Sequence, residues 1–100
     1  MPDYTLEQLK EFKGEGDAPV YFAVKGVIYD ATPAKHLYGP GGSYHKFAGC
    51  ECSRALALMK VEESMCNDDL ADLTEKDLKV LEDWIKKFET KYEVVGKVIK

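Results

Sequence analysis

Residues 38–49 read YGPGGSYHKFAG, and this stretch decides how the rest of the chain is interpreted. Its Gly-Pro-Gly-Gly run at 39–42 cannot form regular structure, because proline lacks an amide hydrogen and glycine weakens both helices and strands. We expect a loop whose glycines adopt backbone conformations that other residues avoid and leave room for a flat ligand. Tyr38 and Tyr44 flank the loop, and Phe47 follows Tyr44 by about one helical turn.

Two interpretations of these aromatic side chains stay open at this level. Tyrosines beside a glycine-rich loop are commonly half-buried packing residues. Alternatively, a flat aromatic ligand enters where Gly41 and Gly42 leave room, and meets the phenol oxygens of Tyr38 and Tyr44. A tyrosinate is a recognised axial ligand of haem iron, and a ferric ion is a strong enough Lewis acid to displace a phenol proton whose free pKa is about 10.

The first third of the chain predicts short elements. Thr5-Leu6-Glu7-Gln8 fits a capping box, which opens a short helix. Val20–Val24 and Val27–Tyr29 are β-prone runs separated by a Lys-Gly pair, a pattern typical of a hairpin with a tight turn. Thr32-Pro33 predicts another short helix, with threonine as its N-cap and proline at its first position.

The remainder predicts helices and a closing strand. Ser43–Phe47 and Ser53–Met59 are expected to be helical on either side of a glycine. Thr74 opens the longest helix, in which apolar residues at 78, 81, 85, 88 and 92 recur at three- and four-residue spacing. Val94–Ile99 predicts a short strand. The expected fold class is α+β: one domain over residues 1–100, with a small sheet and short helices around one core.

Charge limits the classes of function. The chain of 100 residues has 14 basic and 18 acidic side chains and a net charge of −4, which argues against nucleic-acid binding. Residues 20–60 carry a net charge of +3, whereas residues 61–93 carry −6. No apolar run approaches the roughly 18 residues of a membrane span, and no signal peptide opens the chain. We therefore expect a soluble intracellular protein without a membrane span.

The cysteines and catalytic motifs add further limits. Cys50, Cys52 and Cys66 are an odd number, which does not suit a disulfide framework and favours a reducing compartment. A metal site built from them and a histidine matches the spacing of structural zinc sites poorly, while an exposed thiol among them would be open to oxidation. The sequence has no Gly-x-Ser-x-Gly or phosphate-loop pattern. We expect no enzyme and no catalytic residues.

Beyond these patterns, the chain from Tyr4 to Ile99 resembles the membrane-associated progesterone receptor family, a branch of the cytochrome b5-like haem/steroid-binding domains. The motif Tyr-Gly-Pro-Gly-Gly-x-Tyr-x-x-Phe-Ala-Gly carries the resemblance most specifically. The resemblance implies a cytochrome b5-like fold with a haem crevice between helix pairs. Four stretches match in the family's order: Tyr21–Thr32, Leu37–Ala57, Asp72–Trp84 and Phe88–Val98.

The resemblance also implies a ligand for the iron of haem b. Cytochromes b5 hold the iron with two histidines, but this chain has only His36 and His45, and none in its second half. In the tyrosine-ligated relatives the axial residue is the tyrosine after the glycine loop, which is Tyr44 here. His45 is the rival ligand, although adjacent helical positions point about 100° apart, so that it should face away.

Other site residues follow from the same match. Tyr38 corresponds to a family tyrosine near the haem. Lys91 and Tyr92 correspond to a Lys-Tyr pair on the last helix, where Tyr92 would lie near the axial phenol and Lys91 would pair with a propionate. A core role for Tyr92 and a solvated Lys91 remain open alternatives. The predicted cofactor-binding residues are Tyr38, Gly41, Gly42, Tyr44, Phe47, Lys91 and Tyr92, with Tyr44 as the metal ligand.

The function implied by the resemblance is that of a non-enzymatic, ferric haem-binding protein. It would serve as an adaptor or haem donor for haem-thiolate monooxygenases of sterol metabolism, in the cytoplasm or at the cytosolic face of the endoplasmic reticulum. One alternative is a steroid or sterol carrier that uses the same crevice. Another is a haem-free interaction module whose acidic 61–93 surface meets basic partners.

Overall fold

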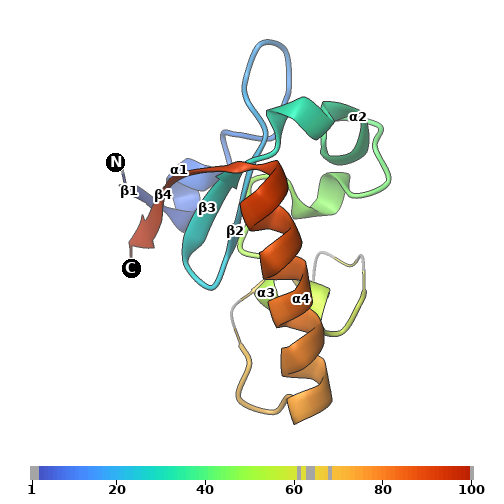
Figure 1. Ribbon diagram of the computed structural model, residues 1–100. Helices are drawn as coiled ribbons and strands as arrows, with labels where there is room; N and C mark the ends of the chain where they lie inside the picture. Colours follow the sequence, from blue (N-terminus) through green and yellow to red (C-terminus); the bar gives the residue numbers. More distant parts are fainter. Residues whose placement is uncertain (1–2, 61, 63–64, 68, 100) are drawn as a thin grey trace.

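The computed structural model describes residues 3–60, 62, 65–67 and 69–99, so part of the acidic stretch 61–93 lies outside the described residues. Four strands form one sheet in the order β1-β4-β3-β2 (Figure 1). β1 runs parallel to β4, whereas the other two pairs are antiparallel. The strands are β1 (Asp3–Thr5), β2 (Tyr21–Val24), β3 (Val27–Asp30) and β4 (Glu93–Ile99).

Short helical elements pack against this sheet, and one longer helix extends away from it (Figure 1). Most of them lie toward one face of the sheet, while α1 packs against the other face, next to β1 (Figure 1). The elements are α1 (Leu6–Leu9), the 3-10 helix η1 (Thr32–Ala34), α2 (Lys35–Tyr38), the 3-10 helix η2 (His45–Phe47), α3 (Ser53–Ala57) and α4 (Glu75–Lys91). None of the helices in the described ranges is long and apolar enough to cross a membrane.

Local sequence signals account for several of these elements. Thr5 and Thr74 each form a complete capping box, with Gln8 and Asp77 respectively, so both predicted helix starts are confirmed. The hairpin between β2 and β3 is also confirmed. Its two turn residues, Lys25 and Gly26, both adopt positive φ (50° and 79°), which matches the right-handed twist of the flanking strands.

Other boundaries differ from the prediction. Ala31, not Thr32, is the N-cap of η1. The Thr32 hydroxyl instead accepts a hydrogen bond from the Val20 amide at 3.1 Å, next to the start of β2. The segment predicted as helical from residue 43 contains only the single 3-10 turn η2. The helix predicted to reach Met59 ends at Ala57, and Met59 itself has a positive φ of 55°. These turns are too short to satisfy their own backbone groups, so tertiary contacts fix their ends.

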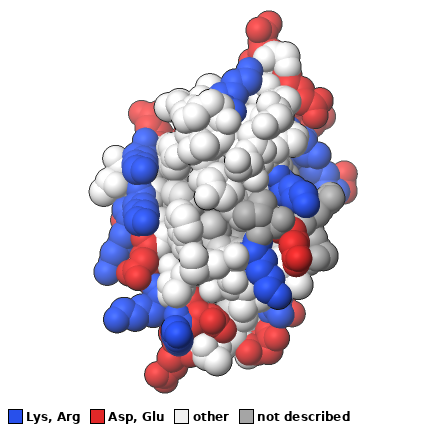
Figure 2. Space-filling model, turned by 90° about the vertical axis from the view of Figure 1, so that its right-hand side faces the viewer, with Lys and Arg blue, Asp and Glu red and all other residues white. Residues whose placement is uncertain are grey.

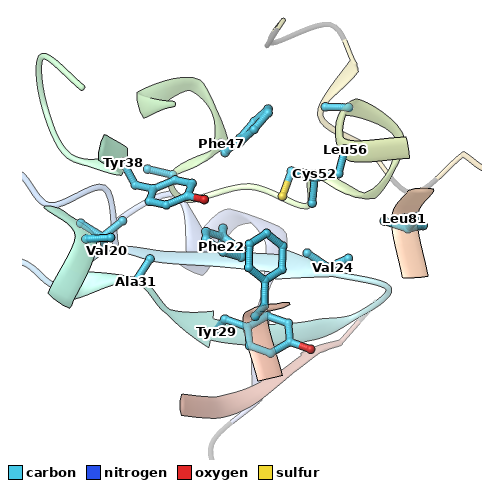
Figure 3. Packing of buried hydrophobic residues seen from close by; sticks show 14 of the residues in the cluster. Val20, Phe22, Val24, Tyr29, Ala31, Tyr38, Phe47, Cys52, Leu56 and Leu81 are labelled. Carbon is cyan, nitrogen blue, oxygen red and sulfur yellow. The ribbon is translucent and has the colours of Figure 1, made fainter. Parts of the chain in front are cut away.

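The alternation of side chains along the strands separates two apolar clusters. Phe22 and Val24 point into the larger cluster between the sheet and the helices, where Phe22 packs below Tyr38 and Phe47 (Figure 3). Ala23, between them in sequence, points to the opposite face and packs with Leu9 of α1. The apolar stripe of α4 is confirmed, because Leu81 and Phe88 are buried in the larger cluster.

Candidate functional site

A mostly apolar crevice of about 120 Å³ opens among the helices. Tyr38 ends α2, Tyr44 follows the glycine loop and Phe47 lies in η2, while the opposite wall comes from α3, its following turn and α4. The loop and the aromatic side chains predicted from the sequence are therefore neighbours in space. The complete lining is Tyr38, Tyr44, Phe47, Ala55, Leu56, Met59 and Trp84.

The glycine loop reverses the chain and brings Tyr44 back beside Tyr38. The Tyr44 amide donates to the Leu37 carbonyl at 2.8 Å, and a Cβ on Gly42 would collide with that same carbonyl. The ring centroids of Tyr38 and Tyr44 consequently lie 5.6 Å apart. Gly41 adopts a φ of +82° at an exposed position. Neither Gly41 nor Gly42 lines the crevice, so both act here by shaping the loop.

The two crevice tyrosines differ in environment. Tyr38 is only 5% exposed, and burial raises the pKa of its phenol well above the usual value. A hydrogen bond with the Tyr92 hydroxyl raises it further, so Tyr38 stays protonated across the physiological range. Tyr44 is half-buried, and its ring stacks on Phe47 with a centroid separation of 5.8 Å and an interplanar angle of 8°. Tyr44 is thus the more accessible of the two phenols.

The two residues at the end of α4 differ in burial: Tyr92 lies against the core, whereas Lys91 is exposed. Tyr92 packs in the larger cluster, with its ring centroid 6.0 Å from that of Phe22 and 5.8 Å from that of Phe88. Its phenol is hydrogen-bonded to that of Tyr38. Tyr92 therefore contributes to the crevice indirectly, by orienting Tyr38. Lys91 is exposed in the last turn of α4 and does not line the crevice.

Neither histidine lines the crevice. The Nδ1 atom of His45 lies 3.1 Å from the Tyr38 carbonyl oxygen, and the ring lines a different cavity on the basic side of η2. His36 is exposed on α2. Within the described ranges, no group of three His, Cys, Asp or Glu side chains is arranged to hold a metal ion. Tyr38 and Tyr44 supply the phenol oxygens among the residues that line the crevice.

Four of the seven residues that line the crevice were not predicted from the sequence. Trp84 and the 70% exposed Met59 stand opposite the tyrosines, together with Ala55 and Leu56 of α3. A signal for Trp84 exists, because it lies three residues after Leu81 and four before Phe88, and so belongs to the apolar face of α4. Its ring stacks on that of Phe88 at 5.8 Å.

A buried carboxylate holds α3, and with it one wall of the crevice. Glu51 is 5% exposed and accepts the Gly26 amide at 3.0 Å, the Ser53 amide at 3.0 Å and the Ser53 hydroxyl. Ser53 in turn accepts the Lys25 amide at 2.7 Å. These bonds fasten the start of α3 to the β2–β3 turn.

Comparisons with known proteins extend these observations. Residues 5–98 match the family model described as "Cytochrome b5-like Heme/Steroid binding domain". An Arabidopsis thaliana protein named "Probable steroid-binding protein 3" is 45% identical over 98 residues, which cover 97% of this chain and 98% of that protein. A solved Arabidopsis thaliana protein, described as having a cytochrome b5 like fold, superposes with a TM-score of 0.90 at 44% identity and covers 100% of this chain and 93% of its own.

Two longer relatives are similar to this chain over part of their length. The Schizosaccharomyces pombe "Cytochrome P450 regulator dap1" is 36% identical over 104 residues, covering 97% of this chain and 63% of that protein. The human "Membrane-associated progesterone receptor component 2" is 35% identical over 101 residues, covering 98% of this chain and 45% of that protein. The chain thus spans 63% and 45% of these two relatives, and nearly all of the Arabidopsis one.

Proposed function

The chain belongs to the family of cytochrome b5-like haem/steroid-binding domains, in its membrane-associated progesterone receptor branch, and we propose that it binds ferric haem b through Tyr44. The observation that carries this proposal is that the two rival iron ligands, Tyr44 and His45, lie in different cavities. The Tyr44 phenol lines the apolar crevice, whereas the His45 ring lies in another cavity with its Nδ1 atom beside the Tyr38 carbonyl. A single phenolate is a known mode of haem-iron ligation.

The lining suits a haem in its chemistry. Aromatic and aliphatic side chains cover a porphyrin face well, and Tyr44 supplies an oxygen donor. The crevice is small for such a ligand. Its volume is about 120 Å³, whereas ligand pockets commonly measure roughly 300–1,000 Å³. The crevice would therefore enclose only part of a tetrapyrrole, unless Met59 and Trp84 moved outward on binding.

Each predicted site residue would have its own role in haem binding. Tyr44 would hold the iron, while Phe47, stacked on it, would fix its ring and exclude water from one side. Tyr38 would act as a neutral hydrogen-bonding neighbour, oriented by Tyr92. Lys91 would pair with a propionate, and Gly41 and Gly42 would shape the approach. Bound haem would supply an iron centre that phenolate ligation keeps in the ferric state.

We further propose that the role of this site is non-enzymatic. The relative from Schizosaccharomyces pombe is named as a regulator of cytochrome P450, which supports a role as an adaptor or haem donor for haem-thiolate monooxygenases. The relatives named as membrane steroid-binding proteins support a place near membranes, and we propose the cytosolic face of the endoplasmic reticulum.

A steroid or sterol is the second candidate ligand. The description of the family model and the names of several relatives both refer to steroid binding. The crevice would offer the same apolar walls to a rigid four-ring ligand, with phenol hydroxyls as hydrogen-bond partners. Both ligands would then compete for one site.

The test is a haemin titration followed by visible absorption, with the wild type beside Tyr44→Phe, His45→Ala and Tyr38→Phe. We expect saturable one-to-one binding with a ferric high-spin tyrosinate spectrum, lost in Tyr44→Phe only. A Tyr44→Phe chain with unchanged affinity and spectrum would refute the ligand assignment. A spectrum lost only in His45→Ala would assign the iron to the imidazole instead.

Competition separates the two ligands. A fluorescent sterol probe is titrated into the ligand-free chain and into the haemin-loaded chain. Weaker sterol binding after haemin loading supports a shared crevice, whereas sterol binding that is unaltered by haemin would exclude it.

A further inference from the structure

Two cysteines from distant parts of the sequence meet beside η2. The Cys50 thiol donates to the Lys46 carbonyl at 3.2 Å, and the Cys66 sulfur lies 3.5 Å from the same oxygen. Interaction with the Cys66 thiol is also the main reason that the pKa of Cys50 is raised. Two thiols that share one carbonyl acceptor are candidates for a disulfide, in which the sulfur atoms lie about 2.0 Å apart.

The surroundings of the pair suit an anionic reagent. Both thiols line a cavity of about 370 Å³ whose wall also carries Lys10, Lys13 and Lys46. Both side chains are partly exposed, so a reagent in the cavity can reach them. Ammonium groups attract anions, and so raise the concentration of an anionic reagent beside the two thiols.

The third cysteine provides an internal contrast. Cys52 is 1% exposed, and its thiol donates to the Ala23 carbonyl at 3.4 Å inside the larger apolar cluster. Burial raises the pKa of Cys52 well above its usual value. A soluble reagent should therefore distinguish Cys52 from the other two cysteines.

We propose that Cys50 and Cys66 form a reversible intramolecular disulfide with glutathione disulfide, an anionic low-molecular-weight disulfide, as the oxidant. The Cys66 thiolate attacks one glutathione sulfur: a Cys66–glutathione bond forms, the bond within glutathione disulfide breaks, and one glutathione thiolate leaves. Cys50 then loses its proton and attacks the Cys66 sulfur, which releases the second glutathione. The two protein thiols give up two electrons and two protons, and one glutathione disulfide becomes two thiols.

The order of the two attacks follows from the environment of Cys50. Interaction with Cys66 and burial raise the pKa of Cys50, which keeps this thiol protonated and leaves the first attack to Cys66. The product would link the residues after η2 to the segment before α4, and Cys50 also lies 3.2 Å from the carbonyl of Phe47, a crevice residue. Closing a loop of about 15 residues in this way should raise the unfolding midpoint by on the order of 10 °C.

The experiment compares the reduced wild type with Cys52→Ala, Cys50→Ser and Cys66→Ser after incubation with excess glutathione disulfide. Remaining thiols are alkylated, and the chains are analysed by intact mass, peptide mapping and thermal unfolding. The wild type and Cys52→Ala should lose two hydrogens, yield a peptide linked from residue 50 to 66, show no disulfide between chains and unfold at a higher temperature. Cys50→Ser should keep one glutathione on Cys66, because the resolving thiol is gone, and dithiothreitol should reverse every change.

Three results would overturn the proposal: alkylation of both Cys50 and Cys66 in the treated wild type, a mixed disulfide with glutathione that persists in the wild type, or a disulfide that involves Cys52 or a second chain. The wild-type result does not depend on whether any variant folds. None of the readouts involves haem, so the outcome is separate from that of the haemin titration.

Discussion

Glu51 places a carboxylate inside the fold. Its hydrogen bonds join the β2–β3 turn to α3, two segments that are distant in sequence. Its carboxylate receives two amide donors and one hydroxyl donor, from Gly26 and Ser53. Because hydrogen bonds to a buried charge replace strong hydration, each donor left without its acceptor costs free energy. Glu51 therefore stabilises the joint between the β2–β3 turn and α3, and so the position of the crevice wall.

Replacing Glu51 with Gln tests this role. The amide group would turn a donor toward groups that are themselves donors, so we expect the free energy of unfolding to fall by about 1–3 kcal/mol. Urea unfolding followed by circular dichroism measures the change. Glu15→Gln, at an exposed position, is the matched control and should leave the midpoint unchanged. Equal midpoints for Glu51→Gln and the wild type would contradict the assigned role.

Tyr38 predicts a dependence of stability on alkaline pH. Burial, and then its interactions with Tyr92, raise the pKa of Tyr38 in the folded state. The unfolded chain therefore loses the phenol proton first, and the stabilising contribution is fully present below about pH 10 and declines above it. In Tyr38→Phe the decline of stability above pH 10 should be less steep, with no change in slope between pH 7 and 9. Urea midpoints measured from pH 7 to 11 check this, and identical alkaline slopes would refute it.

Between elements, an ion pair holds the segment before α4 against α3. Arg54 contacts Asp72 through two nitrogen–oxygen pairs, at 2.5 and 3.0 Å, and also donates to the Asp69 carbonyl at 2.9 Å. The Arg54 guanidinium lowers the pKa of Asp72 below its ordinary value. The pair thus orients the start of α4, the helix that brings Trp84 to the crevice.

The sign of the pH effect follows from that lowered pKa. The contribution of Asp72 is present above the unfolded-state pKa of about 4 and is lost as the pH falls through the folded-state value. We expect Asp72→Asn to be less stable at pH 7 and to lose less stability than the wild type upon acidification to pH 3. Thermal unfolding across this range measures both, with Asp17→Asn as the exposed control. Parallel acid profiles for Asp72→Asn and the wild type would exclude this contribution.

The elements also show what could be predicted from the sequence. Signals confined to a few residues were sufficient for the hairpin, both capping boxes and the buried face of α4. β1 was missed because its partner is β4, at the other end of the chain, and a three-residue strand carries almost no signal of its own. Glu51 and the α3 side of the crevice were missed for a related reason, because their positions depend on contacts with residues distant in sequence.

At the scale of the whole molecule, one face separates uncharged from charged side chains. The side that lies at the right in Figure 1 carries a broad uncharged band, bordered on both sides by lysine, arginine and acidic residues (Figure 2). A crevice of about 120 Å³ with an exposed Met59 at its rim suits a ligand that stays partly outside. Such a ligand would also be accessible to a partner protein, which agrees with the proposed role as an adaptor or haem donor.

Resonance Raman spectroscopy of the haemin-loaded chain tests the central claim most directly. The spectrum is recorded with ordinary and with ring-deuterated tyrosine, for the wild type, Tyr44→Phe, Tyr38→Phe and His45→Ala. Tyr44 ligation predicts iron-bound phenolate vibrations that shift on deuteration, vanish in Tyr44→Phe and persist in the other two variants. A haemin-loaded wild type without phenolate vibrations, or with vibrations that survive in Tyr44→Phe, would contradict it.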